Sequence, residues 1–269
     1  MTINYFIIDT FTKEPFKGNP TAIFYTTAPI QTHIAQMVAK ELNLPVTGFI
    51  NKTGPENEKH TIRYFTPITQ IPACGHATLA AAAVLLETEK SEKANFTTSE
   101  NINIATEIIN GKIALAYPKY FTDNFTIERE LLNNLDLLAY VEAGFCKELE
   151  TLFIELEQAN IVRNVKPDYH KLLSLDVSFK EVVIFALSDS NDYDFVLRSF
   201  CPWIGIDEDP VTGSVHSVLA VKWQKKLQKD TLRAYQASER GGEVGLHVFD
   251  DKINISGDFV IVGRGELSI

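Results

Sequence analysis

Two short polar turns carry the residues that could do chemistry in this chain. The first is Cys74-Gly75-His76, and the second is Asp209-Pro210-Val211-Thr212-Gly213-Ser214. A thiol, an imidazole and a carboxylate are groups that proteins use to move protons or to act as nucleophiles. Each turn leads into a mostly apolar run, so we expect both sets of reactive side chains at helix N-termini.

The run after the first turn, residues 77–86, contains no charged side chain. A helix that is apolar on every side is buried, and Ala and Leu favour helix formation. The first N–H groups of a helix have no partner within it and carry the positive end of its dipole, so they bind anions. We therefore expect Cys74, Gly75 and His76 to form a carboxylate or phosphate site.

The second turn repeats this arrangement. When Gly213 is aligned with Gly75, the run 217–223 falls on the first helix, and a Pro-containing turn precedes each. The repeat predicts two similar halves, each with a central helix, and a cleft where the two N-termini meet.

Each candidate residue also has a structural interpretation. Asp209 precedes a proline and projects from a turn, either as an acid, base or substrate anchor or as a cap of the next helix. Thr212 and Ser214 could likewise bind a ligand or cap the helix. At a helix N-terminus His76 is expected to be neutral, and Cys74 is either a thiolate or a small buried residue.

Other polar residues are interpreted as structural. Cys146 and Cys201 lie outside such turns, and His216, expected one turn inside its helix, is interpreted as a packing or lining residue. The turn at residues 240–242 is not a phosphate-binding loop, so no nucleotide is predicted. No CxxC or HExxH spacing predicts a metal ion.

The composition excludes several classes of protein. The 269 residues suffice for one large domain or two ordinary ones, and 45% are hydrophobic, so a packed core is expected. A net charge of −10 without a basic patch argues against a nucleic-acid partner. Three cysteines, an odd and sparse count, fit a reducing compartment. The N-terminus is not typical of a signal peptide and no apolar run could span a membrane, so we expect a cytoplasmic protein.

The order of elements predicts an α+β fold. Predicted strands outnumber helices and are joined by hairpins, with Asn110-Gly111 as the clearest turn. A helix is expected over residues 126–138 with Thr126 as its N-cap. We place the halves at residues 1–118 and 119–269, with central helices from Gly75 and Gly213, and the last strand free to pack back on the first half.

Six short motifs run in order through nearly the whole chain. They are Asp9-Thr10-Phe11, Phe16-Lys17-Gly18-Asn19-Pro20, Phe65-Thr66-Pro67, Cys74-Gly75-His76-Ala77-Thr78-Leu79, Glu208-Asp209-Pro210-Val211-Thr212-Gly213-Ser214 and Ala237-Ser238-Glu239-Arg240-Gly241-Gly242. In this set the chain resembles the PhzF-like phenazine-biosynthesis family, which shares its fold with diaminopimelate epimerase and proline racemase. The resemblance implies two pseudo-symmetric halves, each a mostly antiparallel sheet rolled around a central buried helix.

The resemblance also implies a function. It predicts a cofactor-independent isomerase of small carboxylic acids, usually a homodimer, with the substrate carboxylate and the growing enolate charge near the helix N-termini. The family's catalytic or substrate-contacting positions fall on His76, Asp209 and Ser214. Its backbone-donor positions fall on Gly75 and Gly213, and Asn19 is expected to line the site.

One departure from the family pattern matters more than the others. The phenazine isomerase has a proton-moving glutamate where the segment Asn43-Leu44-Pro45-Val46-Thr47 has Val46. Our first hypothesis is a proton-transferring isomerase or epimerase with Asp209 as the leading acid or base, His76 as an orienting partner and Cys74 as a possible second base. The alternative, which rests on Val46, is a non-catalytic protein that binds a small anionic metabolite or acts by interaction. Metal-dependent hydrolysis ranks third.

Overall fold

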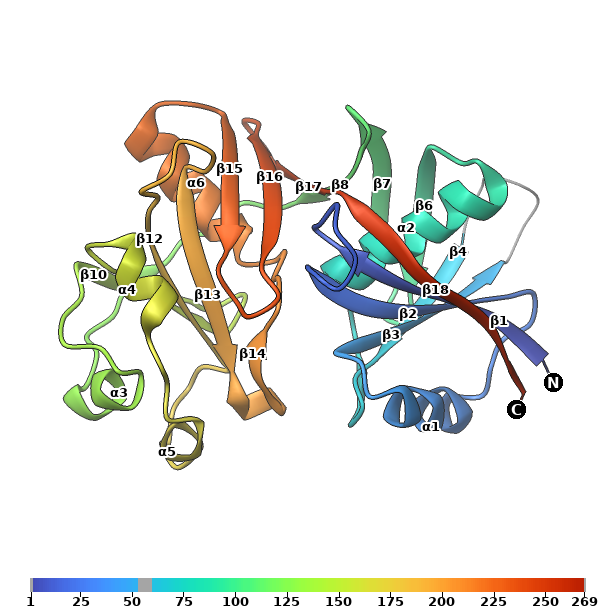
Figure 1. Ribbon diagram of the computed structural model, residues 1–269, viewed down its shortest axis with the longest axis horizontal. Coiled ribbons are helices and arrows are strands. Elements are labelled where there is room, and N and C mark those ends of the chain that lie inside the picture. The colour runs from blue at the N-terminus through green and yellow to red at the C-terminus, as the bar shows by residue number, and fades with distance from the viewer. Residues whose placement is uncertain (1, 53–59, 269) are drawn as a thin grey trace. The chain divides into compact units, whose positions relative to one another are not determined.

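The computed structural model describes residues 2–52 and 60–268 (Figure 1). The chain forms two compact units. The first unit comprises Met1–Ala116 and Ile255–Ile269, and the second comprises Tyr117–Asn254. Strands outnumber helices in both, and most strand pairs are antiparallel, so the α+β class predicted from the sequence is confirmed.

The first unit is a sheet in which each strand pairs with the next in space. The spatial order is β18 (Phe259–Ser268), β1 (Thr2–Thr10), β2 (Asn19–Thr26), β3 (Val46–Lys52), β4 (His60–Phe65), β6 (Lys93–Thr98), β7 (Asn103–Ile109) and β8 (Lys112–Tyr117). The pairs β2–β3 and β4–β6 are parallel, and the other pairs are antiparallel. The short strand β5 (Gln70–Ile71) shares one edge of β4 with β6.

The second unit has its own succession of paired strands. Their order is β9 (Asp123–Asn124), β10 (Glu142–Cys146), β11 (Thr151–Glu155), β12 (Glu181–Leu187), β13 (Phe195–Cys201), β15 (Thr231–Gln236) and β16 (Gly242–Val248). The pairs β11–β12 and β13–β15 are parallel. The short strand β14 (Ile206–Asp209) shares one edge of β13 with β15. The strand β17 (Ile253–Gly257) follows, and with it the chain passes from the second unit back into the first.

The two units repeat one sequence of connections. A hairpin, β1–β2 or β10–β11, is followed by a helical crossover to a parallel strand, β3 or β12. The crossover is α1 (Thr32–Leu42) in one unit, and α4 (Ala159–Asn164) with α5 (Tyr169–Leu173) in the other. A strand, a short strand, a second helix and another parallel strand then follow in each. This correspondence confirms the two similar halves predicted from the alignment of Gly75 with Gly213.

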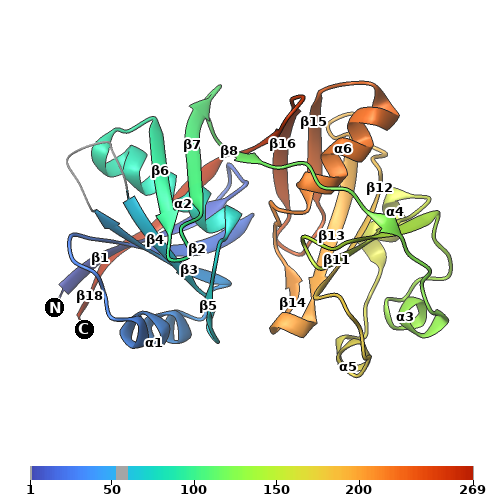
Figure 2. The same cartoon turned by 180° about the vertical axis from the view of Figure 1, so that it is seen from behind.

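The central helix of the first unit, α2 (Gly75–Glu89), is buried from His76 to Leu85, as its uncharged sequence predicts. It lies on the face of the β1–β4 strands opposite α1 (Figures 1 and 2). Tyr64 of β4 faces α2, because its hydroxyl lies 2.6 Å from that of Thr78. Successive residues along each strand alternate between the two helices, whereas directly paired residues on neighbouring strands face the same helix.

Two predicted helix starts are wrong. The second central helix, α6 (His216–Leu227), begins three residues after Gly213. The N–H groups of His216 and Ser217 donate to the carbonyls of Gly213 and Ser214, so the chain makes tight i→i+3 turns before the helix starts. The helix α3 (Arg129–Asn134) has Glu128, not Thr126, at its N-cap, because the chain stays extended through Glu128 while Ile127 is buried in the core.

Candidate functional site

The N-terminus of α2 is held by hydrogen bonds that leave the Cys74 thiol out of the capping. Cys74 is the extended residue before the helix, and its carbonyl accepts from both the N–H (3.0 Å) and the hydroxyl (2.7 Å) of Thr78. Tyr64 in turn contacts the Thr78 hydroxyl. Among the described residues, no protein acceptor takes the N–H groups of Gly75, His76 and Ala77. These are the donors an anion would need.

The thiol and the imidazole of this turn are in contact. Cys74 Sγ lies 3.4 Å from Nδ1 of His76 and 3.7 Å from Nε2. His76 is 7% exposed, and burial lowers its pKa to about 3. The imidazole is therefore neutral at physiological pH, as predicted, although the cause is burial rather than the helix dipole. A neutral ring can donate at one nitrogen and accept at the other.

Asn19 is fully buried at the start of β2, where the Thr10 hydroxyl donates to its carbonyl at 3.1 Å. The preceding turn is shaped by a buried carboxylate, since Oδ2 of Asp9 accepts from the N–H of Phe16 at 2.6 Å. Phe16 has φ 67° and Gly18 has φ 63°. A Cβ on Gly18 would overlap the Thr10 carbonyl oxygen, so this turn requires glycine there.

Val46 lies on the side of the sheet that faces α2. Gly48 pairs with Tyr64, which faces this helix, and strand residues two apart share a face. Val46 is 4% exposed and pairs with Thr21, whose buried hydroxyl has no partner among the described residues. The position that holds a proton carrier in the family pattern is therefore apolar in this chain.

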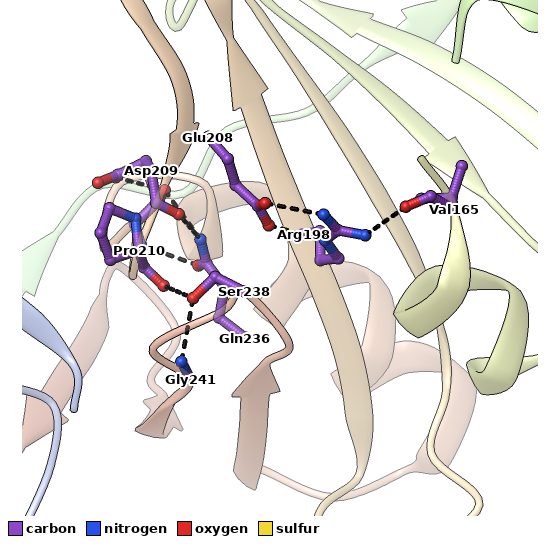
Figure 3. Close-up of polar contacts among 9 residues, drawn as sticks. Val165, Arg198, Glu208, Asp209, Pro210, Gln236, Ser238 and Gly241 are labelled. Atoms are coloured by element: carbon purple, nitrogen blue, oxygen red, sulfur yellow. Dashed lines mark hydrogen bonds and ion pairs between the residues drawn. The ribbon is translucent and has the colours of Figure 1, made fainter. Parts of the chain in front are cut away.

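In the second unit, Asp209 ends β14 and is bound within its own turn. Its Oδ2 accepts from the hydroxyl of Thr212 at 2.6 Å. The buried amide of Gln236 spans this turn from β15, with Nε2 donating to the Asp209 carbonyl at 2.7 Å and Oε1 accepting from the Thr212 N–H at 2.8 Å (Figure 3). Ser238 donates to the Pro210 carbonyl at 2.7 Å and accepts from the Gly241 N–H. The motif at residues 237–242 thus supports the Asp209 turn.

The residue before Asp209 anchors the strand. Arg198 of β13 binds Glu208 through two nitrogens at 2.7 and 2.8 Å, and its third nitrogen donates to the Val165 carbonyl (Figure 3). Both side chains are mostly buried, at 12% and 15% exposure. A bidentate pair of this kind fixes geometry as well as charge, so β14 is held firmly where it delivers Asp209.

Acidic groups surround the thiol of Cys201. Burial raises the pKa of Cys201 well above its ordinary value, and the nearby carboxylates of Asp209 and Glu181 add to this. Burial also raises the pKa of Glu181, which receives the hydroxyl groups of Ser199 and Thr151. Cys201 is therefore a neutral, buried thiol, which agrees with its interpretation as a structural residue.

The residues just before α6 resemble the first turn of α2, because their backbone N–H groups are also available to a ligand. Within the described ranges, the N–H groups of Gly213, Ser214 and Val215 donate to no protein acceptor. His216, the first helical residue, is wholly buried and packs on the Phe195 ring at 5.7 Å. It serves as a packing residue, as the sequence predicts.

A cavity of about 230 Å³ lies in the second unit. It opens between α6 and the strands β10 to β12, with Phe153 and Phe185 inside and Lys222 and Lys225 along the helix. Lys222 binds Glu155 at 2.8 Å and also Glu142. None of the predicted site residues lines this cavity.

The described residues contain neither a candidate metal site nor a membrane-spanning helix. In residues 2–52 and 60–268 no three His, Cys, Asp or Glu side chains form a group that could hold a metal ion. No helix in the same part of the chain is long and apolar enough to cross a membrane.

Comparison with known proteins agrees with this architecture. Residues 8–265 match the sequence model of the family described as phenazine biosynthesis-like protein, PhzC-PhzF. An uncharacterized isomerase of Halalkalibacterium halodurans is 34% identical, with 99% of each chain covered. The crystal structure of a PhzF-family phenazine biosynthesis protein from Enterococcus faecalis matches with a TM-score of 0.92 at 34% identity over 100% of both chains.

A more distant structure shares the fold alone. A probable proline racemase of Agrobacterium radiobacter has a TM-score of 0.66 at 8% identity and covers 99% of this chain and 93% of its own. The family and the epimerase-type fold inferred from the six motifs are thereby confirmed.

Proposed function

Because this chain belongs to the phenazine biosynthesis-like (PhzC-PhzF) family, which includes proteins named as isomerases, we propose that it is a cofactor-independent isomerase or epimerase of a small carboxylic acid. The observation that carries the proposal is the oriented carboxylate of Asp209. The Thr212 hydroxyl binds one of its oxygens, in a turn that leads to the donors before α6. An acid or base held in this way beside an anion site suits proton transfer at carbon.

The proposed reaction needs no group outside the chain. Asp209 removes a proton from the carbon next to the substrate carboxylate, and the C–H electrons move into the carboxylate to form an enolate. The N–H groups that precede α6 in the same unit as Asp209 bind the growing negative charge. A proton then returns, either to the same carbon from its opposite face or to another position of the conjugated system. The family resemblance further implies that neutral His76 is an orienting partner and that Cys74 is a second base.

The alternative remains a protein that binds a small anion without catalysis. It is supported by the buried valine at position 46, where a proton carrier is absent. Under this alternative the free N–H groups still bind the carboxylate, but no hydrogen leaves carbon.

Proton NMR in D₂O separates the two functions. The protein is incubated with a panel of α-amino acids and unsaturated ring carboxylates, and loss of a C–H signal reports exchange. We expect exchange with the wild type, none with Asp209→Asn, and normal exchange with Asp207→Asn, an exposed carboxylate of the same strand. Full exchange by Asp209→Asn would refute the proposed role.

The variant Val46→Glu tests the alternative in the same assay. Exchange by Val46→Glu together with an inactive wild type would favour the binding function, because the missing glutamate would then account for the lost chemistry.

A homodimer is also proposed from the family resemblance. Light scattering should give about twice the chain mass of 30.2 kDa, and the mass of a single chain would contradict it.

A further inference from the structure

We propose that Gln236 is a positioning residue that orients the Asp209 carboxylate through the Thr212 hydroxyl. The inference deepens the proposed function, since it concerns the same acid or base. Gln236 lies in β15, 27 residues after Asp209, and is wholly buried. Its amide reaches the Asp209 turn at both of that turn's ends.

The amide takes the place of the bond that normally closes a turn. In a closed β-turn the first carbonyl accepts from the N–H of the fourth residue. Here the Asp209 carbonyl accepts from Nε2 of Gln236 at 2.7 Å, and the Thr212 N–H donates to Oε1 at 2.8 Å. A backbone carbonyl can only accept and an N–H can only donate, so the orientation of the amide is fixed by chemistry. The turn is therefore held open by one side chain that both donates and accepts.

The same amide sets the direction of the Thr212 hydroxyl. Nε2 of Gln236 also lies 3.4 Å from Oγ1 of Thr212. Because the NH₂ group can only donate, Thr212 must offer it a lone pair and turn its single proton elsewhere. The proton is donated to Oδ2 of Asp209, which lies 2.6 Å from Oγ1 of Thr212. A donor at this oxygen favours the charged carboxylate and holds its plane.

A neighbouring hydrogen bond provides a matched control. The Ser238 hydroxyl binds the same turn at the Pro210 carbonyl, also at 2.7 Å, but no bond joins it to the Thr212 hydroxyl or the Asp209 carboxylate. Removal of Ser238 should loosen the turn without changing the donor to Asp209. Removal of the Gln236 amide should loosen the turn and also leave the Thr212 hydroxyl without a fixed direction.

The test is a ¹³C NMR titration of the Asp209 side-chain carboxyl, assigned with Asp209→Asn. Thr212→Val deletes the hydroxyl that donates to Asp209, and Gln236→Met leaves that hydroxyl free to rotate. Each variant should raise the midpoint of the Asp209 titration by roughly 0.5–1 pH unit. Thr212→Ser keeps a hydroxyl and should restore the wild-type midpoint. Ser238→Ala should lower the melting temperature and leave the midpoint in place. A wild-type midpoint in Gln236→Met, or an equal shift in Ser238→Ala, would overturn the inference.

The deuterium-exchange assay distinguishes this inference from the proposed function. With a substrate found, Gln236→Met should lower kcat about tenfold with little change in KM, and should move the acidic limb of the pH–rate profile by the same amount as the NMR midpoint. An unchanged acidic limb would count against positioning. A wild type that exchanges no compound would count against the proposed function alone, because the titration needs no substrate.

Discussion

His216 is a buried base in a place where a charge would have no partner. It is 0% exposed, and neither ring nitrogen has a hydrogen-bond partner among the described residues. Burial lowers its pKa from 6.5 to about 3. Between these two values the unfolded chain binds a proton that the folded chain does not, so the free energy of unfolding falls as the pH drops. His76 acts in the same direction.

We therefore expect His216→Leu to make the protein less sensitive to acid. At pH 5, about 1.5 units below the unfolded pKa, the wild type should lose about 2 kcal/mol through this one residue, and the variant should keep it. Urea unfolding at pH 7.5 and pH 5 measures the difference. The control is His33→Leu, because His33 is exposed on α1. Equal acid losses in the two variants would contradict the argument.

At the level of single residues, the sequence identifies reactive types but not their partners. The neutral state of His76 is predictable from its place at a helix N-terminus, yet its cause is burial by the surrounding fold. Thr212 is predicted as a ligand or capping group, but its hydroxyl is bound to Asp209. Gln236 carries no motif, since a glutamine within a strand has no sequence signal, and only the approach of β15 to the β14 turn reveals it.

The hairpin turn before β2 provides a test at the scale of one element. Gly18 has φ 63° and no room for a side chain beside the Thr10 carbonyl. Gly18→Ala should lower the free energy of unfolding by about 2–4 kcal/mol and displace Asn19, because backbone strain and overlap add. Gly111→Ala is the control, because Gly111 has φ 78° and open space where a Cβ would lie. It should lower the free energy of unfolding by about 1 kcal/mol. Chemical denaturation compares the two, and equal losses would show that the overlap is unimportant.

Elements were predictable where one local pattern decided them. The uncharged run of α2 and the Asn110-Gly111 hairpin fix their own positions, and both residues of that turn have positive φ. The strand β13 lacks such a pattern because Arg198 interrupts its apolar run, and this buried charge is paired with Glu208 and bonded to the Val165 carbonyl. The helix α6 starts three residues after the expected Gly213, because the aligned glycine marks a turn and tight i→i+3 turns delay the helix to His216.

At the scale of the whole molecule, the two units offer separate spectroscopic probes. A buried cluster around Phe24, Phe49 and Phe65 lies in the first unit, and another around Leu152, Ile184 and Phe200 lies in the second. Both tryptophans, Trp203 and Trp223, lie in the second unit. Tryptophan fluorescence therefore reports the second unit, whereas far-UV circular dichroism reports both.

We expect the two signals to separate during urea unfolding, because chains with two compact units often depart from two-state behaviour. Gly18→Ala alters only the first unit, so it should move the dichroism transition to lower urea and leave the fluorescence transition in place. Arg198→Met breaks a buried ion pair in the second unit. It should lower the free energy of unfolding measured by fluorescence by roughly 3–5 kcal/mol. If both variants moved both transitions equally, the units would unfold as one. A loss of deuterium exchange in Gly18→Ala would then have to be corrected for the lower stability of the whole chain.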